Sequence, residues 1–147
     1  MTDSAPTTPR ISRGFGRVLV VVYGVFAVSA SARAIVQISR DVGEAPVAYA
    51  LSAFAAAVYV VATIALARDA RPTATVAVLI ELVGVLVVGV VSLALPEEFP
   101  RDTVWSAFGR GYGFVPLVLP VVGLWWLWRT RPPADPAESA GGGRGAA

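Results

Sequence analysis

The stretch ATVAVLIELVGVLVVGVVSLAL, residues 74–95, decides the fold of this chain. It holds 22 residues, and its one charged side chain is Glu81. At ~1.5 Å of rise per residue, a helix of this length crosses the ~30 Å hydrocarbon core of a bilayer. The stretch therefore predicts a membrane-spanning helix.

Three further apolar blocks extend this pattern over most of the chain. The blocks at residues 18–38 and 47–67 hold 21 residues each, and the block at 112–128 holds 17 with two prolines. Only helices or closed barrels satisfy their backbone hydrogen bonds inside lipid, and the blocks lack the alternating pattern of barrel strands. We therefore predict an all-α fold, an integral membrane four-helix bundle with short loops over residues 17–131.

The two ends of the chain differ in composition from the blocks. Residues 1–16 are rich in Pro, Thr and Ser, and residues 132–147 are rich in Pro and then in Gly. Neither end can bury enough apolar surface to fold by itself. Both are predicted to be disordered, as a cytoplasmic lead and a cytoplasmic tail.

The composition excludes several kinds of chemistry. The 147 residues are 56% hydrophobic and 15% charged, and they include no Cys and no His. Thiolate chemistry, disulfides and Cys- or His-based metal sites are thereby excluded, and no phosphate-binding loop, catalytic triad or dinucleotide fingerprint is present. We expect no enzymatic activity and no cofactor. The net charge of +2 does not indicate nucleic acid, because the arginines stand mostly at the edges of the apolar blocks.

The arginines predict the orientation of the spans. Cytoplasmic loops are enriched in Lys and Arg, so the side with more arginines is the cytoplasmic one. All 12 basic residues are Arg, and with the abundant Ala, Val, Gly and Pro this usage is typical of a GC-rich bacterial genome. We therefore predict a multi-pass protein of the bacterial cytoplasmic (inner) membrane with both termini cytoplasmic. The predicted inner side holds Arg10, Arg13, Arg17, Arg68, Arg71, Arg129, Arg131 and Arg144, against Arg40, Arg101 and Arg110 outside.

Arg33 interrupts the first block and leaves two interpretations open. A basic start, 11 apolar residues at 18–28 and the triplet Ala30–Ala32 resemble a signal peptide, whose cleavage would make Arg33 the first mature residue. Apolar residues resume at 34–38, however, and complete a segment of span length. We expect the first span to be retained, with cleavage as the alternative.

Polar side chains at spacings of three or four share one face in each of the first three spans. When each span is centred in the membrane, they fall into two layers. We expect Arg33 to snorkel to outer headgroups, with a structural pairing or a ligand contact as alternatives. We expect Glu81 to be neutral and hydrogen-bonded to Tyr59 or Thr63, with proton or ion handling or a partner-protein contact as alternatives. The outer layer holds Arg33, Gln37, Ser52 and Ser92, and the inner layer holds Tyr59, Thr63 and Glu81.

The fourth span carries signals of its own. Pro116 and Pro120 share one face and predict a helix kink, either static or moving. The segment 103–108 before this span predicts a short amphipathic turn at the interface, and the tryptophans at its end, beside Arg129, predict an aromatic belt.

Four strings in this sequence resemble a known family. They are SARAIVQI at 31–38, APVAYALSAFAAAVYVVAT at 45–63, ELVGVLVVG at 81–89 and TVWSAFGRGYGFVPLVLPVVGLWWL at 103–127. Together they resemble a family of small four-span actinobacterial integral membrane proteins, described only as conserved membrane proteins, over residues 14–131. The resemblance implies a helical inner-membrane protein with an uncleaved first span, and it brings no catalytic or ligand residue.

Two functions from different classes fit these observations. The first is a non-enzymatic integral inner-membrane protein, an accessory or assembly component of the bacterial cell envelope. Its partners would be the lipid bilayer and a membrane protein or a second copy of the chain, and not nucleic acid. The alternative is a small transporter or channel subunit that uses Glu81 and Arg33 along a polar path.

Overall fold

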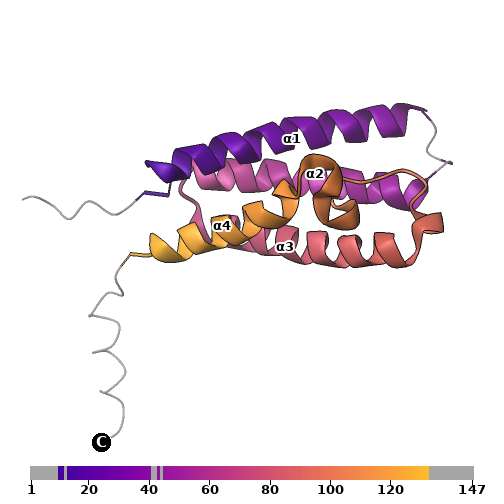
Figure 1. The fold of residues 1–147 in the computed structure, drawn as a ribbon. Coiled ribbons are helices and arrows are strands. Elements are labelled where there is room, and N and C mark those ends of the chain that lie inside the picture. Colours follow the sequence, from indigo (N-terminus) through magenta and orange to yellow (C-terminus); the bar gives the residue numbers. More distant parts are fainter. Residues whose placement is uncertain (1–9, 12, 41–42, 44, 133–147) are drawn as a thin grey trace, which may run out of the picture.

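The computed structural model describes residues 10, 11, 13–40, 43 and 45–132 as an all-helical bundle (Figure 1). Helices α1, α2 and α3 are each long and apolar enough to cross a membrane, which confirms the predicted helical fold. Residues 1–9 of the predicted lead, and residues 133–147 of the predicted tail, lie outside the described residues. The elements are α1 (Phe15–Arg40), α2 (Pro46–Ala67), α3 (Arg71–Ala94), the 3-10 helices η1 (Pro96–Glu98) and η2 (Ser106–Tyr112), and α4 (Val115–Arg129).

Prolines and one tight turn set the ends of α2 and α3. Pro46 is the first residue of α2 and Pro72 the second of α3, positions at which a missing backbone N–H breaks no helical bond. Between the two helices, Asp69 takes a left-handed conformation with φ of 56°. The Ala70 N–H then donates to the Ala65 carbonyl over 2.9 Å, which ends α2 and lets α3 run back beside it.

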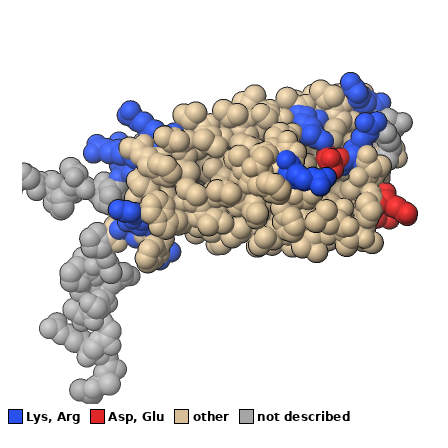
Figure 2. Space-filling model, viewed as in Figure 1, with Lys and Arg blue, Asp and Glu red and all other residues tan. Residues whose placement is uncertain are grey.

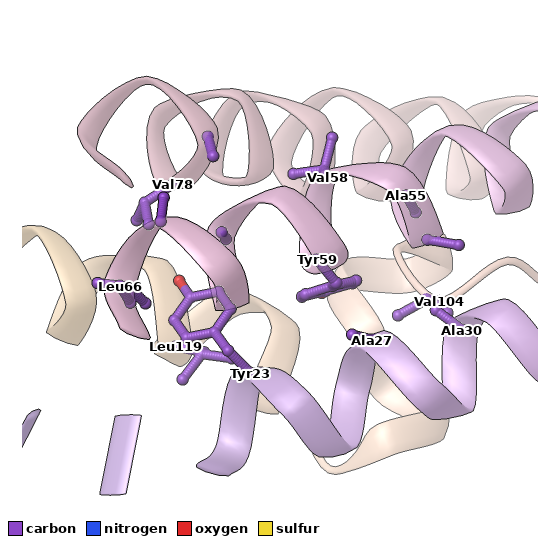
Figure 3. Packing of buried hydrophobic residues seen from close by; sticks show 14 of the residues in the cluster. Tyr23, Ala27, Ala30, Ala55, Val58, Tyr59, Leu66, Val78, Val104 and Leu119 are labelled. Atoms are coloured by element: carbon purple, nitrogen blue, oxygen red, sulfur yellow. The ribbon is translucent and has the colours of Figure 1, made fainter. Parts of the chain in front are cut away.

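Small residues line the contact between α1 and α2. In lipid, helices associate through close packing rather than through the hydrophobic effect, so small side chains let their backbones approach. Figure 3 shows Ala27 of α1 beside Tyr59 of α2, and Ala30 further along α1 beside Val104. The buried face of α1 is offset from the face that carries Arg33 and Gln37, and Ser29, one turn before Arg33 on that same face, is exposed. The buried alanines of the core are Ala27, Ala30, Ala34, Ala55, Ala56, Ala62, Ala65, Ala74 and Ala77.

The link between α3 and α4 folds back into the bundle instead of lying at the interface. Only 1% of Trp105 is exposed. Its indole packs against Gly84 of α3, where an added Cβ would lie 2.5 Å from the ring. Phe108 packs against Gly89 in the same way. The prediction of an interfacial turn is therefore wrong, because two glycines on α3 make room for these aromatic side chains. We call residues 103–114 the re-entrant segment.

Helix α4 is shorter than the predicted span at 112–128. It has 15 residues, roughly 22 Å at 1.5 Å per residue and less than the ~30 Å of the hydrocarbon core. A bend of 99° separates it from η2, and the two make a fourth span only when taken together. The bend is made at Gly113 and Phe114, with φ of 63° and 60°.

The 99° bend lies before the two prolines at which the sequence predicts a kink. Pro116 stands in the first turn of α4, where proline is tolerated, and α4 continues through Pro120. Both prolines are buried, and the ring of Pro116 packs against Gly109 of η2.

At the opposite end of the bundle, the last residues of the predicted lead pack onto α4. Ile11 is fully buried, and the Trp126 indole N–H donates to its backbone carbonyl over 3.0 Å. Trp125 and Trp128 point outward and are 46% and 66% exposed. The Arg129 guanidinium lies 5.3 Å from the Trp125 ring. Trp125 and Trp128 thus face outward, as an aromatic belt requires. The third tryptophan, Trp126, binds the backbone of Ile11 instead.

Candidate functional site

Glu81 lies in the middle of α3 and is completely buried. Its Oε2 accepts a hydrogen bond of 2.7 Å from the Tyr23 hydroxyl of α1. Its other oxygen, Oε1, is also buried and has no hydrogen-bond partner within the part of the chain that the structure describes. The sequence predicted Tyr59 or Thr63 as the hydrogen-bond partner of this carboxyl, whereas the bond in the structure comes from Tyr23.

Two further aromatic side chains, Tyr59 and Trp105, extend the contact between Tyr23 and this carboxyl. The rings of Tyr23 and Tyr59 lie side by side, with centroids 6.2 Å apart (Figure 3). The Trp105 indole N–H donates to the Tyr59 hydroxyl over 3.2 Å. A Cβ added to Gly123 of α4 would lie 3.2 Å from the Tyr23 hydroxyl. All four long helices and the re-entrant segment therefore meet at what we call the carboxyl cluster: Glu81, Tyr23, Tyr59 and Trp105.

Thr63 does not take the predicted role of partner to Glu81. Its hydroxyl donates to the Tyr59 backbone carbonyl of its own helix over 2.7 Å. Sequence reasoning missed Tyr23 because this residue stands in an apolar run outside the polar stripe. The signal that could have found it is the small-residue face of α1, since Tyr23, Ala27, Ala30 and Ala34 recur at steps of three and four.

Arg33 joins α1 to the re-entrant segment. Its Nη1 donates to the Tyr112 hydroxyl over 3.2 Å, and its Nη2 donates to the Asp102 backbone carbonyl. Its Nε is buried with no hydrogen-bond partner among the described residues. The guanidinium thus makes the structural pairing that the sequence left open as an alternative to the snorkelling anchor. One partner, Tyr112, was predicted to begin the fourth span, and the other, Asp102, precedes the re-entrant segment.

The remaining predicted residues of the outer layer have separate roles. The Ser92 hydroxyl accepts from the Ala107 N–H over 2.8 Å and donates to the Gly89 carbonyl over 3.1 Å. It thereby stabilises a backbone position at which Ala107 has φ of 47°. Ser52 is fully buried, and its hydroxyl has no partner among the residues described; the same holds for the side-chain oxygen of Gln37.

Arg33 also lines an open pocket of about 400 Å³ at the end of the bundle. We call it the arginine pocket, because three guanidinium side chains line it. A second hollow, of about 280 Å³, shares Arg33 and adds Arg110 and Tyr112. The arginine pocket is lined by Arg33, Arg40 and Arg101, by Gln37 and Tyr49, and by Ala32 and Val36.

A series of aromatic rings separates Glu81 from Arg33. The ring centroids of Tyr112 and Phe26 lie 5.9 Å apart, and those of Phe26 and Tyr59 lie 5.6 Å apart. Tyr59 then contacts Tyr23, the donor to Glu81. The two charged residues therefore have separate partners, and packed rings fill the route between them.

The structure thus has one buried carboxyl, Glu81, bound by the Tyr23 hydroxyl. It also has three guanidinium side chains that line an open pocket. Within the described ranges, no group of three or more His, Cys, Asp or Glu side chains could hold a metal ion. Comparison with known protein families, with curated proteins and with solved structures found no match to this chain.

Proposed function

We propose that this protein is a non-enzymatic, multi-pass accessory or assembly component of the bacterial cytoplasmic membrane. The observation that carries the proposal is that its embedded polar side chains bind other parts of the bundle. Tyr23 of α1 binds Glu81 of α3, and Arg33 binds the re-entrant segment. Glu81 and Arg33 thus connect elements of the bundle to one another, which is a structural role.

The outer surface of α2 and α3 supports the assembly part of the proposal. A groove of about 490 Å³ runs between these helices. Its lining includes the small residues Ala57 and Ala77, with Phe54 and Ile80 as larger neighbours. A groove with small residues lets the backbone of another helix approach closely in lipid. A second copy of the chain, or a span of a larger envelope protein, would fit such a surface.

The distribution of charge supports an orientation with both termini in the cytoplasm. Figure 2 shows arginines at both ends of the bundle, with the visible acidic residues gathered at one of them. Arg101 stands close in sequence to Glu97, Glu98 and Asp102, whereas the other end joins the start of α1 to the end of α4. Reporter fusions after Arg71 and Arg131 should be cytoplasmic and one at Glu98 external; a cytoplasmic signal at Glu98 would contradict the topology.

The course of α1 supports retention of the first span. The helix runs without a break through Ala30–Ala32, the triplet that resembles a cleavage site, and Ala30 is buried against the core. The intact mass of the protein purified from its native membrane should include residues before Arg33. A mature chain that begins at Arg33 would overturn this part of the proposal.

Crosslinking in the native membrane tests the assembly proposal directly. A photoreactive amino acid at Ala57, in the groove, should form adducts with a defined protein or with a second copy. The matched control is Val25, which is 58% exposed on the outer side of α1. Because the chain has no Cys, disulfide trapping through Ala57→Cys can then test for a second copy without background. Lipid adducts alone at both positions would contradict the proposal.

One observation favours the alternative of a small transporter or channel subunit. Glu81 Oε1 is buried without a hydrogen-bond partner among the described residues, as a site for a proton or an ion would require. The packed rings between Glu81 and Arg33 oppose a continuous path through both. A pH-dependent flux in reconstituted vesicles that Glu81→Gln abolishes, with stability unchanged, would replace the accessory proposal with this one.

A further inference from the structure

We propose that the arginine pocket binds a phosphate group, as carried by the headgroup of an acidic phospholipid. The first reason is charge. Arg33 and Arg40 of α1 and Arg101 of the following link line one pocket. Guanidinium groups match the geometry of phosphate oxygens, which they bind through pairs of N–H donors. A phosphate between Arg33 and Arg40 would be attracted by both positive charges.

The second reason is a pair of unsatisfied polar atoms beside these charges. Arg33 Nε and Gln37 Oε1 are both buried and have no hydrogen-bond partner in the described part of the chain. Both side chains line the arginine pocket. Buried polar groups in native proteins are normally paired. A phosphate oxygen would accept from Arg33 Nε, and a hydroxyl or ammonium of the same headgroup would donate to Gln37 Oε1.

The third reason is the lateral position of the pocket. Ala32 and Val36 form its apolar wall. Val36 is 50% exposed and its neighbour Ile35 is 64% exposed, so this wall continues into the outer surface of α1. A lipid could therefore lay its acyl chains along α1 while its phosphate reaches the arginines. A phosphate ion from solution would use the same guanidinium groups but not the apolar wall.

Native mass spectrometry of the full chain in detergent tests the proposal. The probes are phosphatidylglycerol, phosphatidylcholine with the same acyl chains, and inorganic phosphate. We expect phosphatidylglycerol to be retained in preference to phosphatidylcholine. Arg40→Gln should weaken its binding roughly five- to tenfold, the loss of one charge-assisted contact, and Gln37→Leu should weaken it roughly threefold. Arg33 is left unchanged, because it also holds the re-entrant segment.

The control variant is Arg17→Gln, at the opposite end of the same helix. Circular dichroism and thermal unfolding should show that all three variants remain folded. Equal losses for Arg17→Gln and Arg40→Gln, or no preference for phosphatidylglycerol, would overturn the proposal, because general attraction between arginines and lipid would explain the data. Saturation by inorganic phosphate that excludes the lipid would support the phosphate chemistry and assign its source to solution.

Discussion

Glu81 and Arg33 are both ionisable residues of membrane-length helices, yet their surroundings differ. Glu81 is completely buried, with an oxygen bound to Tyr23 and aromatic rings on several sides. Arg33 is half-buried, is bound to the re-entrant segment and lines an open pocket with two further arginines. A carboxyl closed inside the bundle can stabilise the fold, whereas guanidinium groups in an open pocket can also bind a ligand.

The difference arises from the side chains around each charge. At Glu81, glycines and alanines let the helices approach, and Trp105 enters beside Gly84. At Arg33, the side chains of Arg40 and Arg101 line the same pocket, which is open. The core therefore closes over the carboxyl, and the bundle stays open at the arginines.

Removing Trp105 should have the largest effect, because this side chain closes the carboxyl cluster. Trp105→Ala deletes a buried indole and leaves a cavity, and we expect a loss of about 3–5 kcal/mol in the free energy of unfolding. The control is Trp128→Ala, at a tryptophan that is 66% exposed, which should change that free energy by less than about 0.5 kcal/mol. Reversible unfolding in mixed micelles measures both. Equal effects would mean that Trp105 does not close the cluster.

Filling the space beside Trp105 should have the next largest effect. Gly84→Ala places a Cβ against the indole and should destabilise the bundle by about 1–3 kcal/mol. Gly24→Ala is the matched control, because its Cβ would lie an ordinary 3.7 Å from Thr63 and should be neutral or slightly stabilising. Thermal unfolding of both variants in detergent checks the pair. A neutral Gly84→Ala would contradict the insertion of Trp105 at this position.

A double-mutant cycle measures the bond inside the carboxyl cluster. Tyr23→Phe removes the donor to Glu81, and Glu81→Ala removes the acceptor. The coupling free energy between the two should be about 0.6–1.7 kcal/mol, the range of hydrogen bonds inside membrane proteins. Arg33→Gln combined with Glu81→Gln should instead be additive. Strong coupling between Arg33→Gln and Glu81→Gln would show that these two side chains interact. The carboxyl cluster and the arginine pocket would then not be separate sites.

The smallest effect should appear at Arg33 itself. Lysine keeps the charge, but its single ammonium cannot bind both Tyr112 and Asp102 as the two guanidinium nitrogens do. We expect Arg33→Lys to loosen the re-entrant segment by about 0.6 kcal/mol, and Arg40→Lys to leave it unchanged. The rate at which a thiol reagent labels Ala107→Cys in each background measures this effect. Equal labelling in both would mean that lysine holds the segment as well as arginine.

Much of the helical architecture could be predicted from the sequence, but most of the side-chain contacts between the helices could not. The blocks at 18–38, 47–67 and 74–95 correspond to α1, α2 and α3, because hydropathy over span length is a strong local signal. The prediction of one continuous span at 112–128 was less accurate. Its first residues belong to η2 and a left-handed turn, whose conformation depends on contacts with α3.

Local properties of the sequence by themselves determined that the chain forms membrane-length helices, and that polar residues such as Glu81 and Arg33 lie within them. The free energy of placing an apolar segment in lipid is a sum over its own residues, so it needs no partner. Only the tertiary structure decided which groups meet. Tyr23 and Glu81 are 58 residues apart, and Tyr59 and Trp105 are 46 apart. These pairs form because Gly84 and the small residues of α1 and α2 leave space between the helices, and that space exists only once the helices have packed.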